Sequence, residues 1–445
     1  MTRNILLYLL TGVIVLSACQ KKAGEVFDKS PDERLTATLL ANQKVLTSAP
    51  NGWKVYLMPK GLEKSDQLEV GGFSYFMQFT DANRVTMYSD FDTVKAATPN
   101  ESGYRVKGTQ RPSLFFDTYN YIHFPSDPVA SISQSPLGYD GVGWGSDLEF
   151  SFADQKVQGD TIHLKGNQNE SIAIMIKATK AEADAFAAGG LKTSMKKLKD
   201  LNSLGYFKKL VFGNKSYYLG LNEGNRTITF NWLVGGNVQS FTTGYFSTLE
   251  GIWFTNPFVD GSTIVRGINF NSFNVATGTM DVTVNGTSGT ITNGGAPLLV
   301  DVDAPKRWWQ YSVDRDSWWS AYSGFTVNGV SDYFKMRSIP NFYAWIFWAK
   351  YNPAYDAFLI FSLSGNTLSS AGGPATVSPP TFTADGRIIF TYFGSFGTPA
   401  GWTAAMFTEF RTLLSDPNGY YLVQTGPLKY DMVKKDGKAW VTWEW

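Results

Sequence analysis

Short runs of apolar residues, many of them β-branched or aromatic, recur between residue 53 and about residue 177. Turn-forming residues, such as those at 81–83 and 158–160, separate the runs. This spacing is typical of short antiparallel strands and favours a sandwich or a barrel over alternating strands and helices. The eight predicted strands cover residues 53–57, 73–79, 85–89, 104–107, 113–116, 148–152, 161–165 and 172–176.

Three segments carry helix signals instead. Residues 30–33 combine an N-cap serine, a proline suited to the first helical position and a glutamate that completes a capping box. They predict a helix that ends at Asn51-Gly52. A second capped helix is predicted to begin at residues 179–182 and to break near Gly189-Gly190, and a third covers residues 403–414.

Two stretches of the β-rich regions resemble each other. Residues 102–104 (SGY) precede LFFDT at 114–118, and residues 243–245 (TGY) precede GIWFT at 251–255. A duplicated β domain would explain the likeness. A chance similarity between two β-rich stretches explains it nearly as well.

These patterns together predict a mainly β chain, with tandem antiparallel β-sandwich or barrel-like domains and a few short helices. The first domain, a helix plus strands, is expected at 30–178 and a second β domain with a leading helix at 179–302. An aromatic-rich α+β or β region follows at 303–445. A chain of this length normally divides into two or three domains, each with its own core.

The N-terminus has the features of an exported lipoprotein. Residues 5–16 form an apolar run that is too short to cross a bilayer, which predicts a signal peptide over residues 1–18. Small residues precede Cys19, as in the lipobox of bacterial lipoproteins, where the cysteine is acylated. We expect lipid such as palmitate on Cys19, a tether over 19–29 and an outer-membrane location, on either the periplasmic or the surface face. The alternative is an ordinary secretory signal.

The composition limits the kinds of cross-link, metal site and partner that the chain can have. Cys19 is the only cysteine, so the chain has no intramolecular disulfide and no thiolate metal site. The 39 Lys and Arg residues nearly balance the 38 Asp and Glu residues and form no basic stripe, so no nucleic-acid partner is predicted. No later segment is long and apolar enough to span a bilayer, so the lipid is the expected membrane attachment.

Catalytic signals are few. The two histidines, His123 and His163, lie near no nucleophile elbow or zinc-protease motif. No catalytic residue, metal site or cofactor is predicted, and a non-catalytic role is favoured. Two carboxylates would suffice for a glycoside hydrolase, although these residues also suit turns, loops and solvated positions. The candidates are Asp117, Asp140, Asp147 and Glu149.

Aromatic residues make up 15% of the chain, and most of them must build the core. Two adjacent tryptophan pairs, at 308–309 and 318–319, are expected in strands, where neighbours point to opposite faces. One ring of each pair would then lie on the surface and stack against sugar rings. The alternative is a domain interface or a sheet buried on both faces. A glycine-rich loop at 138–145 adds one tryptophan that we expect to be exposed. The candidate ligand-binding residues are Trp144, Trp308, Trp309, Trp318 and Trp319.

The block at residues 114–120 (LFFDTYN), followed by His123 and Asp127-Pro128, resembles a family of Bacteroidota lipoproteins catalogued as domain of unknown function 4302. The lipobox and the Asn-Gly-Trp sequence at residues 51–53 also resemble this family. We expect the likeness to cover nearly the whole chain. We interpret Asp117, Tyr119, Asn120 and His123 as residues that structure a loop. The family supplies no established activity, and it implies an envelope location and a link to polymer uptake through SusC/SusD-type systems.

We therefore expect a non-catalytic cell-envelope lipoprotein that binds a glycan or another polymer in such an uptake system. One alternative is an accessory protein-interaction subunit of an outer-membrane transporter complex. Another is a carboxylate-based glycoside hydrolase. Exposed tryptophan rings would favour sugar, a flat apolar patch would favour a protein partner, and two carboxylates facing each other across a cleft would favour the hydrolase.

Overall fold

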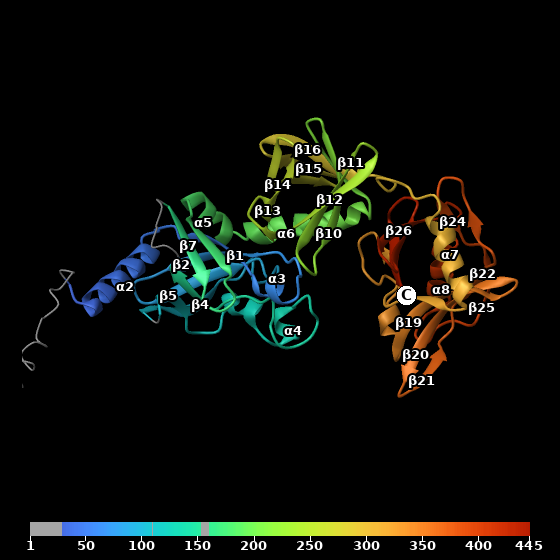
Figure 1. Ribbon diagram of the computed structural model, residues 1–445, viewed down its shortest axis with the longest axis horizontal. Helices are drawn as coiled ribbons and strands as arrows, with labels where there is room; N and C mark the ends of the chain where they lie inside the picture. Colours follow the sequence, from blue (N-terminus) through green and yellow to red (C-terminus); the bar gives the residue numbers. More distant parts are fainter. Residues whose placement is uncertain (1–28, 109, 153–159) are drawn as a thin grey trace, which may run out of the picture.

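The computed structural model describes residues 29–445, except residue 109 and residues 153–159. Cys19, the signal peptide and almost all of the tether lie outside the described residues. Three β-rich parts follow one another along the longest axis of the molecule, in chain order (Figure 1). The mainly β architecture with tandem antiparallel, barrel-like domains is confirmed.

The first part is a closed barrel of eight antiparallel strands, in which each strand pairs with its neighbours along the chain. The first and last strands close it, in a register that sets Trp53 opposite Lys177. The sequence was compatible with either a sandwich or a barrel, and this strand pairing shows that the domain is a barrel. The strands are β1 (Trp53–Met58), β2 (Phe73–Phe79), β3 (Arg84–Ser89), β4 (Asn100–Gly108), β5 (Pro112–Phe116), β6 (Glu149–Phe152), β7 (Thr161–Gly166) and β8 (Ile172–Lys177).

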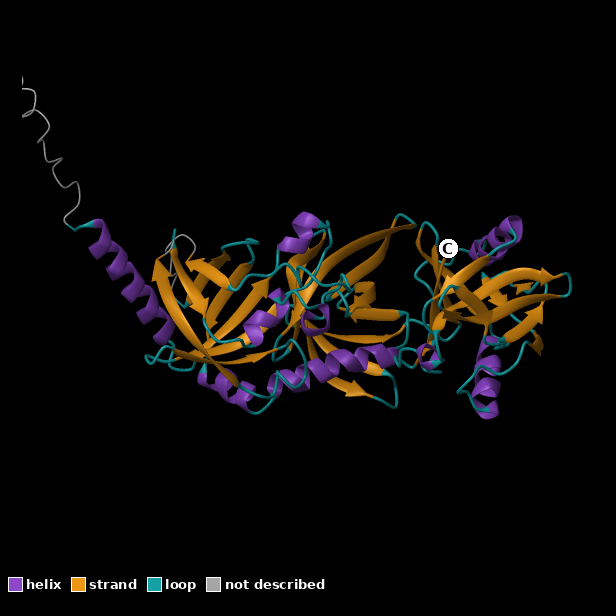
Figure 2. Ribbon diagram, turned by 90° about the horizontal axis from the view of Figure 1, so that it is seen from below, coloured by secondary structure: helices purple, strands orange, loops and turns teal. Residues whose placement is uncertain are grey.

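Helix α2 (Pro31–Thr47) projects from the end of this barrel (Figures 1 and 2). The predicted capping box is confirmed, because the Ser30 hydroxyl accepts from the Glu33 amide and the Glu33 carboxylate accepts from the Ser30 amide. The indole of Trp53 donates to the carbonyl of Leu46 at 2.8 Å, which ties the end of the helix to the barrel. Short helices lie in the barrel loops: α3 (Gly61–Ser65), η1 (Tyr121–Ser126) and α4 (Ala130–Ser133).

Side chains fill the interior of the first barrel. Tyr75 and Phe150 are among its fully buried residues. An internal void between Val55 and Met175 measures only about 10 Å³, roughly the space of one water molecule. Eight-stranded barrels can hold a small ligand when the interior is left open. This barrel is instead a packed core, so a ligand site must lie elsewhere.

A second closed barrel of eight antiparallel strands follows, and its first strand pairs with both its second and its last strand. Helices α5 (Lys180–Ala187), α6 (Gly190–Asp200) and η3 (Leu201–Leu204) lead into it, as the capped helix at 179–182 predicted. The strands are β9 (Lys208–Phe212), β10 (Lys215–Asn222), β11 (Thr227–Val234), β12 (Asn237–Ser247), β13 (Gly251–Asp260), β14 (Thr263–Asn274), β15 (Thr279–Val284) and β16 (Thr287–Asn293).

The two similar sequence stretches fall on the fourth and fifth strands of each barrel. In the first barrel the Ser102 hydroxyl donates to the carbonyl of Thr118 on the far side of the β4–β5 turn, at 2.7 Å. In the second barrel the Thr243 hydroxyl donates to the carbonyl of Asn256 at 2.9 Å, in the same place. The shared strand number and the shared hydrogen bond favour duplication over chance.

The third part is a sheet of twelve strands with two helices, α7 (Ala304–Arg315) and α8 (Ala404–Leu414), and a short turn, η4 (Met336–Ser338). The predicted helix at 403–414 is confirmed, with Thr403 as its N-cap. Trp308 of α7 and Phe410 of α8 belong to one buried core, so both helices pack on the same face of the sheet. The strands are β17 (Trp318–Ala321), β18 (Thr326–Val327), β19 (Phe342–Asn352), β20 (Tyr355–Ser364), β21 (Thr367–Ser370), β22 (Pro374–Val377), β23 (Thr381–Phe382), β24 (Arg387–Ile389), β25 (Tyr392–Ser395), β26 (Tyr420–Gly426), β27 (Lys429–Lys434) and β28 (Ala439–Glu444).

The two barrels are joined by a buried ion pair. Arg226, in the turn between β10 and β11, donates to the carboxylate of Asp90 and to the carbonyl of Gly72, both at 2.9 Å. The guanidinium also lies 4.3 Å from the centre of the Phe73 ring. Asp90 is fully buried and accepts the backbone amide of Ser247 from the second barrel at 2.8 Å. This barrel junction therefore holds a fully buried carboxylate against a guanidinium whose side chain is 12% exposed.

The second barrel meets the C-terminal part through an aromatic cluster. Phe207 packs with Tyr421 and Val433 of the sheet. The Tyr206 hydroxyl donates to the carboxylate of Asp431 at 2.7 Å. The Tyr206 amide also donates to the carbonyl of Gly437 at 2.7 Å, and the Asn293 side chain donates to the carbonyl of Asp436 at 2.6 Å. This sheet junction thus combines aromatic contact with hydrogen bonds and contains no buried ion pair like that of the barrel junction among the described residues.

Candidate functional site

The tryptophan pair at 308–309 does not form part of a surface platform. The expectation that this pair lies in a strand is wrong, because both residues belong to helix α7. Trp308 is fully buried and Trp309 nearly so. The helix lies against strands β19, β24 and β26, so neighbouring positions on it both face the core. The Trp309 indole donates to the buried carboxylate of Asp356 at 3.0 Å.

The second pair is divided between two faces, as strand geometry requires. Trp319 points into the core, where its indole donates to the carbonyl of Trp308 at 2.9 Å. Trp318 points to the opposite face of the sheet and is partly exposed. Of the four paired tryptophans, Trp318 is the one that the described structure does not bury.

The expected exposure of Trp144 is also wrong. Its ring is 97% covered, since only 3% of its surface is accessible, and its indole donates to the carbonyl of Ser133 at 2.8 Å. The ring packs edge-on against Phe73, with 5.0 Å between ring centres. Positive φ angles at Gly143 and Gly145 fold the loop back onto the barrel, so the glycine-rich segment buries the side chain.

Trp318 marks one end of a surface that the sequence did not identify. Strands β17, β19, β20 and β25 carry partly or fully exposed aromatic side chains on the face of the sheet opposite α7 and α8. We define the aromatic surface by its six rings. They are Trp318, Trp348, Tyr351, Tyr355, Phe393 and Phe396.

The six rings form a continuous chain of contacts. Trp318 lies 4.9 Å from Trp348, measured between ring centres, and Trp348 lies 5.3 Å from Tyr351. Tyr351 then lies 6.1 Å from Tyr355, which stacks on Phe393 at 5.2 Å with an interplanar angle of 26°. Phe396, which directly follows β25, lies 5.6 Å from Tyr351. These distances are typical of paired aromatic side chains. The rings therefore form one extended platform.

The local sequence explains why this face is aromatic. Alternation in β19 sends Phe347 into the core and Trp348 outward. The register between β19 and β20 shifts after Trp348, and Lys350 adopts a positive φ of 51°. This irregularity lets Tyr351 follow on the same side, with 43% of its surface exposed.

Polar groups accompany the rings. The Trp348 indole donates to the carboxylate of Asp316 at 3.3 Å. In the described part of the chain, the hydroxyls of Tyr351 and Tyr355 have no hydrogen-bond partner. Phe393 is the most exposed of the six rings, at 53%. The surface thus offers apolar ring faces together with uncommitted hydroxyl groups.

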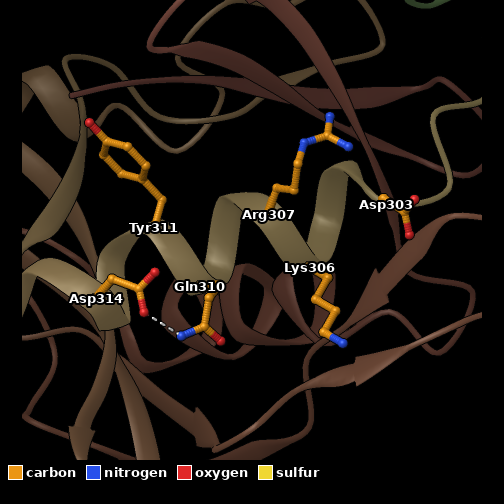
Figure 3. A pocket seen from close by; sticks show the side chains of 6 residues that line it. All are labelled: Asp303, Lys306, Arg307, Gln310, Tyr311 and Asp314. Atoms are coloured by element: carbon orange, nitrogen blue, oxygen red, sulfur yellow. Dashed lines mark hydrogen bonds between the residues drawn. The ribbon is translucent and has the colours of Figure 1, made fainter.

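A shallow depression of about 570 Å³ lies along the exposed side of α7 (Figure 3). Several of its polar groups are already paired, because Arg307 binds the carboxylate of Asp301 through two nitrogens and Gln310 donates to Asp314 at 2.6 Å. Figure 3 shows that the labelled side chains all come from this one helix or its start. We therefore do not assign the depression a ligand.

The four loop residues make local contacts. Asp117 accepts two hydrogen bonds from Arg105, which holds the pKa of Asp117 below its ordinary value. Asn120 caps η1, and its amide donates to Nδ1 of His123 at 3.0 Å. Burial lowers the pKa of His123, so the ring is neutral at neutral pH. Tyr119 stacks on His123 and donates to Asp127.

Three of the four carboxylates considered for hydrolysis serve structural contacts, and the fourth, Glu149, is exposed at the start of β6. Asp147 accepts the backbone amides of residues 168, 169 and 171. Asp140 accepts the amide of Ala130 at 2.8 Å. A general acid in a glycosidase needs a raised pKa, whereas that of Asp117 is lowered. Within the described residues, no group of three or more His, Cys, Asp or Glu side chains is arranged for a metal ion.

A family model described as Domain of unknown function (DUF4302) matches residues 24–272. The chain belongs to this family. The match spans both barrels as far as β14 and ends before the C-terminal sheet, so it is shorter than the near-complete likeness expected from the sequence. The aromatic surface lies outside the matched residues, and the barrel junction lies within them.

Other comparisons add little. No curated protein matches the chain. Among solved structures, the octameric penicillin-binding protein homologue from Pyrococcus abyssi is similar at 10% identity and a TM-score of 0.16, over 34% of this chain and 36% of that chain. The chain therefore spans about a third of that structure. In the part of the chain that the structure describes, no helix is long and apolar enough to cross a membrane.

Proposed function

We propose that this chain is a non-catalytic, lipid-anchored protein of the bacterial cell envelope whose aromatic surface binds glycan chains for a SusC/SusD-type uptake system. The observation that carries the proposal is the group of six contacting, solvent-accessible rings on one sheet face. The anchor rests on the lipobox at Cys19 and the link to uptake on the family resemblance.

Glycan chemistry suits this surface. A pyranose ring presents an apolar face of C–H groups, which packs on an aromatic ring, and a rim of hydroxyls, which need hydrogen-bond partners. The hydroxyls of Tyr351 and Tyr355 and the carboxylate of Asp316 supply such partners. Several rings in a row would contact successive sugar units, so the surface suits a chain better than a single sugar.

The position of the surface supports the same role. Helix α2 lies at one end of the long axis, and the C-terminal sheet lies at the other (Figure 1). A chain attached through Cys19 would hold its aromatic surface at the end farthest from the anchor. The two packed barrels would then act as a spacer between membrane and ligand.

Affinity measurements on residues 20–445 test the proposal. We expect retention on at least one polysaccharide of a panel of soluble and insoluble glycans. Trp348→Ala and Phe393→Ala should each weaken that binding about tenfold or more, because exposed aromatic anchors carry a large share of contact energy. Tyr139→Ala is the matched control, since Tyr139 is 57% exposed in a loop of the first barrel.

Two outcomes would contradict the proposal. If the chain binds none of the glycans, the proposed ligand class is wrong. If Trp348→Ala and Tyr139→Ala bind a glycan equally well, the aromatic surface is not the binding site. Co-purification of an outer-membrane transporter that depends on Phe393, without any glycan binding, would favour the accessory-subunit alternative. Acylation is checked separately by labelling with palmitate, which Cys19→Ser should abolish.

A further inference from the structure

Strand β19 carries extra residues at the point where it enters the aromatic surface. Its regular pairing with β20 stops at Trp348 and resumes at Asn352. Residues 349–351 of β19, which we call the bulge, therefore lie opposite a single residue of β20, Asp356. Extra residues of this kind disrupt the ladder, so their backbone groups need other partners.

Two buried side chains bind the backbone amides of the bulge. The Lys350 amide donates to Oδ1 of Asp356 at 2.7 Å, and the Ala349 amide donates to the hydroxyl of Ser312 at 3.0 Å. Both Asp356 and Ser312 are fully buried. These two side chains thus satisfy backbone groups in the part of β19 that the regular pairing leaves out.

Helix α7 supports both contacts from the core face of the sheet. Ser312 belongs to α7, and its hydroxyl donates to the carbonyl of Ser317, the residue before Trp318. The second carboxylate oxygen of Asp356 accepts the indole of Trp309, also in α7, at 3.0 Å. The aromatic surface is therefore held from behind, through hydrogen bonds that its own rings do not make.

The C-terminal end of α7 also reaches the aromatic surface directly. Asp316 ends the helix and accepts the indole of Trp348 at 3.3 Å. The helix is thus connected by hydrogen bonds to Trp348 itself and, through Ser312, to the residue that precedes Trp318.

The bulge decides which face of the sheet Tyr351 occupies. Simple alternation from Trp348 would turn residue 351 toward the core. Tyr351 instead lies edge-on to Trp348 at 5.3 Å and to Phe396 at 5.6 Å, measured between ring centres. It also lies 6.1 Å from Tyr355, so it joins Trp348 to the rest of the aromatic surface.

A carboxylate is a costly side chain to bury at this position. Burial raises the pKa of Asp356, because the charged form loses its hydration. An apolar side chain would fill the core without that cost, but it could not accept the Lys350 amide. Buried polar groups are best known for fixing one register among several, which is what the bulge requires.

We infer that Asp356 and Ser312 are positioning residues of the aromatic surface, which hold the bulge so that Tyr351 stands beside Trp348 before any ligand arrives. A surface assembled in advance spares the ligand the cost of ordering it. The effect on glycan binding rests on the proposed function. The arrangement of the rings does not, and the two are measured separately.

Fluorine NMR on residues 20–445 labelled with fluorotryptophan tests the arrangement. The Trp348 signal is the one missing from Trp348→Phe, and Tyr351→Ala, which removes the edge-on ring, gives its displaced position. Asp356→Ala removes both acceptor oxygens and should move the Trp348 signal most of the way to that position. Ser312→Ala, which deletes only a hydroxyl, should move it less and in the same direction.

Leu414→Ala is the matched control, because Leu414 is fully buried in the same core but belongs to helix α8. This large-to-small change should lower the melting temperature. It leaves the amides of the bulge bonded, so the Trp348 signal should stay in place. An equal displacement in Leu414→Ala and Asp356→Ala would make Asp356 an ordinary core residue and overturn the inference.

The glycan that the unmodified chain retains best is then titrated into each variant. Asp356→Ala should weaken its binding about as much as Tyr351→Ala, roughly tenfold, and Leu414→Ala should bind it normally. A displaced Trp348 signal with unchanged glycan affinity would contradict the positioning role in binding.

An unmoved Trp348 signal in Asp356→Ala and Ser312→Ala overturns the inference, whether or not a glycan binds. If Asp356→Ala does not fold, the signal of Ser312→Ala decides alone. A displaced signal in these variants, together with no glycan binding by the unmodified chain, supports the positioning of the rings and contradicts the proposed function.

Discussion

The barrel junction and the sheet junction join the same second barrel to its two neighbours with different chemistry. At the barrel junction, Arg226 and Asp90 form an ion pair whose carboxylate is fully buried. At the sheet junction, Phe207 and its aromatic neighbours are in contact, and Tyr206 donates to Asp431. An ion pair fixes one geometry, because each partner is costly to bury alone. An aromatic cluster tolerates small shifts, because its stabilisation follows buried area.

The largest effect is expected when the ion pair is broken. Arg226→Ala leaves the buried carboxylate of Asp90 without its counter-charge, and burial already raises the pKa of that carboxyl. We expect a loss of about 3–5 kcal/mol in unfolding free energy, measured by urea denaturation. Arg84→Ala, which breaks the exposed pair with Glu101, is the control and should cost less than about 1 kcal/mol. Equal losses would show that the barrel junction does not depend on the pair.

The second effect concerns Lys208, which is buried near the sheet junction and donates to the carbonyl of Gly205 at 2.7 Å. Burial lowers the pKa of Lys208 to about 8, from 10.5. The folded chain then loses this proton at lower pH than the unfolded chain, so stability should rise as pH increases from about 8 to 10.5. The difference between the two pKa values corresponds to at most about 3 kcal/mol.

The rise in unfolding free energy is measured by urea denaturation at pH 7.5 and at pH 10. These two values bracket most of the pH range between the folded and unfolded pKa values. Lys208→Met should abolish this rise in unfolding free energy. It should also stabilise the chain at the lower pH, because no charge is then buried. Lys209→Met, which changes the neighbouring lysine on the same strand, is the control and should leave the rise in place. A rise that persists unchanged in Lys208→Met would assign it to other groups.

The third effect tests how closely the barrels approach. A Cβ added at Gly71 would lie 2.3 Å from the carbonyl oxygen of Arg226, which is backbone and cannot rotate away. We expect Gly71→Ala to cost about 1–3 kcal/mol and to lower the melting temperature. Gly220→Ala, in strand β10, meets its nearest neighbour at 3.5 Å, an ordinary contact, and should be nearly neutral. A neutral Gly71→Ala would mean that the barrels separate easily.

The smallest effect is expected at the sheet junction. Tyr206→Phe removes the hydroxyl that donates to Asp431, but Thr442 still donates to the same carboxylate at 2.6 Å. We expect a loss of about 1–2 kcal/mol in a urea melt. Tyr217→Phe removes a similar bond to Asp260, which Lys215 also contacts at a partly exposed position, and should cost less. A loss as large as that of Arg226→Ala would erase the difference between the junctions.

Strand positions and helix caps could be predicted because they depend on local pattern. A run of apolar and aromatic residues placed β2 at 73–79, and the capping box placed the start of α2 after Ser30. The closure of each barrel depends on pairing between residues as distant as Trp53 and Lys177, which no local pattern specifies. The same limit explains why Arg226, which is ordinary in its sequence context, was not identified as a junction residue.

The site was predicted less well than the fold. The aromatic content pointed to a platform, yet the pair at 308–309 was placed in a strand although it forms part of helix α7. Trp318 proved partly exposed, while Trp144 was buried by its own loop. A signal for the correct surface did exist in the aromatic run at 342–348, because alternation there sends Trp348 outward. Its partners Tyr355 and Phe393 come from other strands and needed the sheet order.

Closure of both barrels has a further consequence for how copies of this chain meet. A closed barrel has no edge strand, so among the described strands only the C-terminal sheet offers unpaired backbone groups, at its end strands β23 and β25 and at the side strands β18 and β21. Unpaired edges are where chains add to one another and aggregate. Any self-association through strand pairing is therefore confined to the end of the molecule opposite α2. An edge at β25 would also bring Phe393 of a second copy next to that of the first.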